Sequence, residues 1–199
     1  EREALVAAIR ILEKEGFLEY KLGDKINAGD KLYYNNREKS LYIISAGTEP
    51  IECGVRVSAA HIDSPRLDLK QHPLYESDGL GYLKTHYYGG IRKYQWVATP
   101  LALHGVVITK DGKTIKVCVG EDETDPVFYI SDLLPHLAAK QNARPLGEAI
   151  EGEGLNIWLG NIPYVGANDE KDKTVKENLL RILNEKYGMK EEDFLSAEL

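Results

Sequence analysis

The chain opens with apolar and charged residues that recur at the period of an α-helix. Between residues 2 and 15, Leu5, Ile9 and Leu12 fall on one helical face, and charged side chains fall on the opposite face. Gly16 follows, and glycine is the residue that most often ends a helix. The pattern predicts an amphipathic helix that covers a core with its apolar face.

The next apolar runs are short and typical of strands. Residues 32–34 and 41–44 flank a polar segment, which predicts a β-hairpin. A further apolar run, residues 57–60, is followed by His61 and then by Pro65, which cannot donate to a strand ladder. We interpret this run as a buried strand that delivers His61 to the edge of a sheet, as in the opening of an α/β domain.

Beyond Pro65 the pattern changes to several short strands separated by turns. The turn at residues 110–113 gives a strong hairpin signal, because Gly112 can adopt positive φ. This run of strands predicts a barrel-like, mostly β domain inserted into an α/β fold, with domains at residues 1–66 and 67–199. The predicted strands are residues 79–88, 101–109, 114–119 and 155–159, and the predicted helices are residues 132–141 and 174–187.

Composition narrows the class of protein without selecting an activity. The 199 residues are 43% hydrophobic and 29% charged, which are ordinary values for a globular protein. The net charge of -7 argues against nucleic acid as a partner, since phosphate binding needs an excess of lysine and arginine. No apolar run approaches the length of a membrane span, so we expect a cytoplasmic protein without a membrane partner. Cys53 and Cys118 are expected to be small buried residues in strands.

His61 and Asp63 form the most informative pair of polar residues. In an extended segment, residues i and i+2 point to the same side, so the Asp63 carboxylate shares a face with the imidazole. His61 is then a candidate metal ligand, and Asp63 can fix its tautomer. The plainer interpretation is a strand-end histidine followed by a turn. A hydrolase triad of Ser64, His61 and Asp63 is disfavoured, because adjacent residues rarely converge as a triad does.

Three separated motifs stand in a defined order along the chain. They are Ala60–Pro65 (AHIDSP), Tyr87–Ile91 (YYGGI) with Trp96, and Ser131–Leu137 (SDLLPHL). In this order they resemble the aspartyl aminopeptidase family of two-zinc exopeptidases, to which the vacuolar aminopeptidase also belongs. The likeness is to the bacterial branch, in which basic residues follow the glycine motif, and it covers nearly the whole chain.

The resemblance implies that this chain is the amino-terminal part of a zinc aminopeptidase. The family's bridging aspartate, its glutamate pair, a further acidic ligand and its last histidine lie beyond the position that matches Leu199. We therefore carry over only His61 as a metal ligand and Asp63 as its catalytic neighbour, and we interpret Glu191 and Glu192 as a solvated surface. The implied reaction is removal of amino-terminal residues from peptides by two divalent metals, expected to be zinc, with an acidic preference left open. The chain alone is expected to be inactive.

Residues near the glycine motif are further candidates. Arg92 and Lys93 are cations on a loop beside aromatic residues, and they can face an acidic substrate or a carbonyl oxygen. In eukaryotic members of the family a histidine reaches the active site of the neighbouring subunit, and Lys93 occupies about that position. Arg92 and Lys93 are equally consistent with a solvent-facing basic turn. His86 is a candidate for substrate binding, and a β-surface position is its alternative.

The resemblance also implies an assembly. In the family the inserted domain mediates subunit contacts, and dimers build a hollow particle, commonly a dodecamer, so we expect a homo-oligomer. The alternative function is a non-catalytic assembly module in which the β domain forms an oligomer without chemistry of its own.

Overall fold

The structure is a computed structural model that describes residues 1–164 and 174–199. These residues divide into two compact units, Glu1–Ser64 and Pro65–Leu199, and each is described by itself. No helix in the described ranges is long and apolar enough to cross a membrane.

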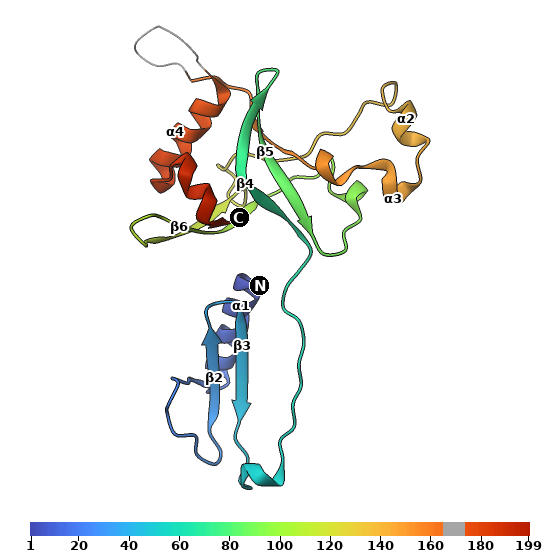
Figure 1. The fold of residues 1–199 in the computed structure, drawn as a ribbon. Helices are drawn as coiled ribbons and strands as arrows, with labels where there is room; N and C mark the ends of the chain where they lie inside the picture. The colour runs from blue at the N-terminus through green and yellow to red at the C-terminus, as the bar shows by residue number, and fades with distance from the viewer. Residues whose placement is uncertain (165–173) are drawn as a thin grey trace. The chain divides into compact units, whose positions relative to one another are not determined.

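The first unit consists of one helix and one three-stranded sheet (Figure 1). Its elements are α1 (Arg2–Lys14), β1 (Leu18–Glu19), β2 (Lys31–Asn36), β3 (Ser40–Ser45) and the 3-10 helix η1 (Ile51–Cys53). β1 is parallel to β2, and β2 is antiparallel to β3. Leu5, Leu12 and Tyr33 are buried, and the Tyr33 hydroxyl donates to Glu13 Oε1 at 3.0 Å, which connects the helix with the sheet. The predicted helix and hairpin are confirmed.

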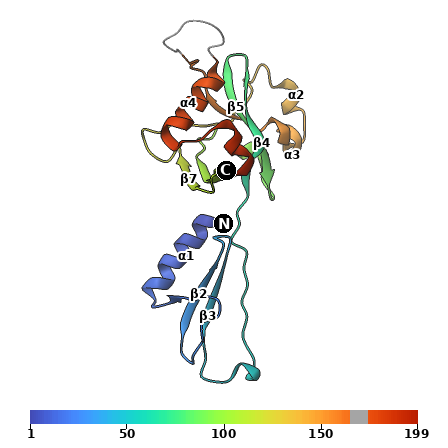
Figure 2. The same ribbon diagram turned by 60° about the vertical axis from the view of Figure 1, so that its left-hand side comes forward.

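The apolar run at residues 57–60 does not form a strand. Residues 54–65 have no regular secondary structure, and Figures 1 and 2 show them as a long trace that follows η1. Val57 is 84% exposed. Among the described residues no strand pairs with this segment. The prediction of a buried strand before His61 is therefore wrong for this structure, because an extended apolar run becomes a strand only with a hydrogen-bonded neighbour.

Two three-stranded sheets form the centre of the second unit. One has the order β4-β5-β8 and the other has the order β7-β6-β9, and all neighbouring strands are antiparallel. The strands are β4 (Arg66–Ser77), β5 (Leu80–Tyr88), β6 (Leu103–Ile108), β7 (Thr114–Val119), β8 (Ile157–Gly160) and β9 (Ala197–Glu198). The helices are α2 (Ala139–Asn142), α3 (Leu146–Ala149) and α4 (Val175–Tyr187), with 3-10 helices η2 (Lys93–Gln95), η3 (Gly152–Gly154) and η4 (Glu191–Ser196).

Helix α4 packs closely against β5. A Cβ on Gly81 would lie 2.6 Å from Leu179 Cδ1, so the strand has no room there for a side chain. The helix begins at a capping box, in which the Thr174 hydroxyl accepts from the Glu177 N–H and the Glu177 carboxylate accepts from the Thr174 N–H. The core beneath it is continuous across both sheets. Its buried residues are Leu74, Leu83, Val107, Val117, Val119, Phe128, Ile130, Leu155, Ile157, Met189, Phe194 and Leu199.

Several boundaries differ from the sequence prediction. β4 was not predicted, because Pro73 interrupts its pattern and its pairing with β5 shifts register between Leu69 and Leu74. The predicted helix at residues 132–141 is helical only at Ala139–Asn142. The other predicted strands, including the hairpin with Gly112 at φ 80°, are present.

The mixed α/β content is confirmed, but the described strands do not close into a barrel. They form three separate sheets of three strands each.

Cys53 and Cys118 are both exposed, which corrects the expectation that they are buried. Cys118 does lie in β7, where its side chain points away from the face that carries the buried Val117 and Val119.

Candidate active site

His61 contacts Asp63 through one ring nitrogen. Its Nδ1 lies 3.0 Å from the Asp63 backbone oxygen and 3.3 Å from Asp63 Oδ1. Both oxygens are acceptors, so Nδ1 donates in this arrangement, and in a neutral imidazole Nε2 then carries the lone pair. The His61 side chain is 84% exposed. The local chain thus presents an exposed histidine whose Nε2 is free of the contact with Asp63.

A complete metal site is not present in the described part of the chain. No group of three or more histidine, cysteine, aspartate or glutamate residues within residues 1–164 and 174–199 is arranged to hold a metal ion. A zinc site ordinarily needs three or four protein ligands. The donors described here therefore do not hold zinc by themselves, and His61 is at most one member of a ligand set.

Arg92 and Lys93 differ in what their charged groups contact. The exposed Arg92 guanidinium donates through Nη1 to the Tyr94 hydroxyl at 3.2 Å, and this hydrogen bond raises the pKa of Arg92 above its ordinary value. The half-buried Lys93 begins η2, and its Nζ lies 5.8 Å from the centre of the Tyr87 ring. Within the described ranges no carboxylate forms an ion pair with Lys93. The same holds for Arg92, so within those ranges neither cation is paired with a carboxylate.

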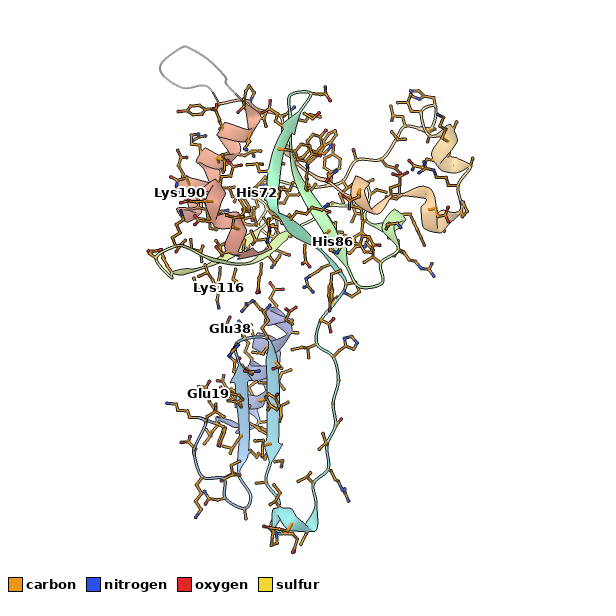
Figure 3. All side chains as sticks on the ribbon, viewed as in Figure 1. Glu19, Glu38, His72, His86, Lys116 and Lys190 are labelled. Carbon is orange, nitrogen blue, oxygen red and sulfur yellow. The ribbon has the colours of Figure 1, made fainter. Side chains whose placement is uncertain are left out.

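His86, labelled in Figure 3, lies near the end of β5. It is exposed, and its backbone pairs with that of Asp68 on β4. Its ring is nearly parallel to the Tyr87 ring, with centres 5.7 Å apart and planes 18° apart. The structure thus brings His86 and Lys93 to the same tyrosine. Tyr87 was quoted in the sequence motif but not selected as a functional residue, because neither its stacking on His86 nor the position of Lys93 beside its ring can be read from the motif.

Glu191 and Glu192 belong to the surface of the second unit. Glu191 pairs with Lys176 at 2.5 Å, and Glu192 pairs with Lys110 at 2.5 Å. The hydrogen bond from Lys110 lowers the pKa of Glu192. Both carboxylates are exposed, so the interpretation of this pair as a solvated surface agrees with the structure.

The comparisons with known proteins identify the family. Residues 2–199 match the sequence model of a family of zinc metalloproteases. The chain belongs to that family, peptidase M18, which is described as aminopeptidase I zinc metalloprotease. The resemblance found from the three motifs is thereby confirmed.

Curated relatives share the sequence throughout the chain. A probable M18 family aminopeptidase 1 from Clostridium acetobutylicum is 53% identical over 203 residues, which cover 100% of this chain and 43% of the relative. A protein of the same description from Thermotoga maritima is 44% identical over 201 residues, with the same coverage. The chain thus spans less than half the length of these relatives.

Solved structures agree with the fold. The M18 aminopeptidase from Thermotoga maritima has a TM-score of 0.89 at 41% identity and covers 99% of this chain, which covers 42% of that structure. Aminopeptidase I from Clostridium acetobutylicum has a TM-score of 0.85 at 48% identity, with 99% of this chain and 44% of that structure covered.

Proposed function

We propose that the whole protein is a zinc-dependent aminopeptidase and that this chain supplies part of its active site. The observation that supports this proposal is the contact between His61 Nδ1 and Asp63, which leaves His61 Nε2 available as a metal ligand. His61 then acts as one ligand of a zinc site, for which two ions are expected. Asp63 holds the ring in position, as a carboxylate commonly does for a ligating histidine. Peptides are the proposed substrates.

The second unit contributes the cationic residues. Lys93 is a half-buried residue without a carboxylate partner in the described ranges, so its ammonium can donate to a carbonyl oxygen or to an acidic side chain of a peptide. Arg92 and His86 are proposed to bind substrate. Lys93 is proposed to act in the site of a neighbouring subunit.

The domain assignment accompanies this function. Residues 1–66 are proposed as the start of the catalytic α/β domain, and residues 67–199 as an inserted domain that forms a homo-oligomer, a dimer that builds a dodecamer. A cytoplasmic location is part of the same proposal. Light scattering of the whole protein at micromolar concentration tests the assembly, and a strict monomer would contradict it.

The test of the metal role is His61→Ala in the whole protein. Zinc content and turnover of an amino-terminal Asp or Glu substrate should fall together, because a ligand and not a surface group is lost. The matched control is His136→Ala, which removes an exposed histidine from the second unit and should keep both quantities. Full zinc and normal turnover in His61→Ala would contradict the assignment of His61 as a ligand, whereas a whole wild-type protein without peptidase turnover would favour the non-catalytic assembly module.

A further inference from the structure

The ring of Tyr87 lies against a segment far away in the sequence. A Cβ on Gly152 would lie 2.7 Å from Tyr87 Cε1 and 3.2 Å from Cδ1, so the ring packs directly on the Gly152 backbone. The same ring has Lys93 Nζ at 5.8 Å from its centre and the His86 ring stacked at 5.7 Å. Tyr87 therefore joins the end of β5, the start of η2 and the start of η3.

The glycine at position 152 is explained by the ring and not by the backbone. Gly152 does not have a left-handed φ, so its main chain makes no special demand for glycine. Gly154, in the same 3-10 helix, has nothing within 4 Å of a built Cβ. The space at Gly152 is thus specific to Tyr87, and an added methyl group would displace the ring.

The Lys93 ammonium lies beside this ring. Within the described ranges it has no ion pair, and its Nζ is 5.8 Å from the centre of the Tyr87 ring. A lysine side chain on a flexible four-carbon stem otherwise samples many rotamers. A cation over an exposed aromatic ring is favoured by a factor of about two to five.

We propose that Tyr87 is a positioning residue. Its ring holds the Lys93 ammonium where the lysine donates to the substrate, and Gly152 leaves the space that the ring occupies. This inference rests on the proposed role of Lys93. Tyr87 acts through the lysine and not on the substrate. The phenol hydroxyl is not needed for this role, because the attraction arises from the face of the ring.

The contact is tested by the reactivity of the Lys93 amine in the whole enzyme. Acetic anhydride is added in limiting amount, and acetylation of each lysine is followed by peptide mass spectrometry. Tyr87→Leu should raise the Lys93 rate by about two- to fivefold, since the ring no longer stabilises the ammonium. Tyr87→Phe should keep the wild-type rate. Equal rates in wild type and Tyr87→Leu, or a rise of the same size in Tyr87→Phe, would overturn the contact.

The consequence for catalysis is tested by a double-mutant cycle. Tyr87→Leu should lower kcat by about two- to fivefold at unchanged zinc content, and it should have no further effect in a Lys93→Ala background. Tyr87→Phe should restore kcat. An equal loss in both backgrounds would overturn action through Lys93. Wild-type turnover of Lys93→Ala would instead overturn the proposed role of the lysine, while the acetylation rates still decide whether Tyr87 holds it.

Gly152→Ala supplies an independent approach to the ring. The added methyl group should displace Tyr87 and reproduce both effects of Tyr87→Leu. Gly154→Ala is the matched control, because it adds the same group to the same helix in open space. The proposal would be overturned if Gly152→Ala matched Gly154→Ala in acetylation rate and in kcat.

Discussion

Gly105 on β6 lies against the backbone of Glu198 on β9, and a Cβ on Gly105 would be 1.8 Å from the Glu198 carbonyl oxygen. Gly105 also has φ 154°, a conformation that residues with a side chain rarely adopt. The two strands pair at the next residues, where Val106 is opposite Glu198. The absence of a side chain at position 105 is therefore required for β9 to join the sheet.

Gly105→Ala should lower the free energy of unfolding by about 3 kcal/mol, because the methyl group overlaps main-chain atoms that cannot move without breaking the sheet. Urea denaturation followed by tryptophan fluorescence measures this, since Trp96 and Trp158 both lie in the second unit. The control is Gly112→Ala, which has φ 80° but open space and should cost about 1 kcal/mol. Equal losses in the two variants would contradict the steric explanation.

Asp125 should make the stability of the second unit depend on pH. Lys186 Nζ lies 2.8 Å from Asp125 Oδ1, and the Gly120 N–H donates to Oδ2 at 2.9 Å. These contacts, with the Lys186 hydrogen bond first, lower the pKa of Asp125 from 3.8 to about 2. A lowered pKa means that the contribution to folding is fully present above pH 3.8 and is lost as the pH falls toward 2.

Asp125→Asn should therefore be less stable than wild type at neutral pH, and the difference should narrow between about pH 4 and pH 2. Thermal unfolding at a series of pH values measures this difference. Glu123→Gln, an exposed change in the same loop, serves as the control and should give a small, pH-independent difference. A difference in thermal stability between Asp125→Asn and wild type that stays constant down to pH 2 would refute the contact of Asp125 with Lys186.

Asp63→Asn in the whole protein should weaken zinc binding by about 10- to 100-fold, because the amide supports the His61 tautomer less well than the carboxylate does. The loss should be smaller than in His61→Ala, since the Asp63 backbone oxygen still accepts from His61 Nδ1. Competition with a chelator of known affinity measures both variants. Wild-type affinity in Asp63→Asn would exclude the positioning role of this carboxylate.

Lys93→Ala in the whole enzyme should reduce turnover by roughly a hundredfold without loss of zinc, as expected when a donor to a developing oxyanion is removed. Lys116→Ala, on the exposed face of β7, is the control for loss of a surface charge and should have little effect (Figure 3). If Lys93 acts in the neighbouring subunit, mixing Lys93→Ala with His61→Ala subunits should recover part of the activity. Failure to recover any activity after verified subunit exchange would count against action in trans.

Local patterns predicted the local elements of this chain well. The period of apolar residues in α1 and the turn at Gly112 depend on neighbours in sequence, so they were readable without a structure. The strand expected at residues 57–60 failed because a strand depends on a partner that its own residues do not specify. β4 was missed because Pro73 and the register shift between Leu69 and Leu74 obscure its alternation.

In the candidate site, too, the local contact was predicted and the long-range contact was not. The spacing of His61 and Asp63 predicted that the two side chains share a side, and His61 Nδ1 lies 3.3 Å from Asp63 Oδ1. The grouping of Lys93 with Tyr87 and Gly152 could not be predicted, since Gly152 lies 65 positions after Tyr87, beyond β6, β7, α2 and α3. Close packing of a ring on a glycine leaves no periodic signal in a sequence.

The pairing of β9 with β6 has a consequence for the order of folding. The Ser196 hydroxyl donates to the Ile108 carbonyl across 88 positions, and the Leu69 N–H donates to the Leu199 carbonyl. These long-range contacts cannot form on the ribosome until the segment at residues 196–199 has emerged. The contacts between helix α1 and its hairpin span shorter distances in sequence, 20 positions for Tyr33 with Glu13 and 36 for Arg2 with Glu38, so they can form once residues 1–45 have emerged. The first unit should therefore acquire structure early in synthesis, and the second unit should complete its core late, as contact order dictates.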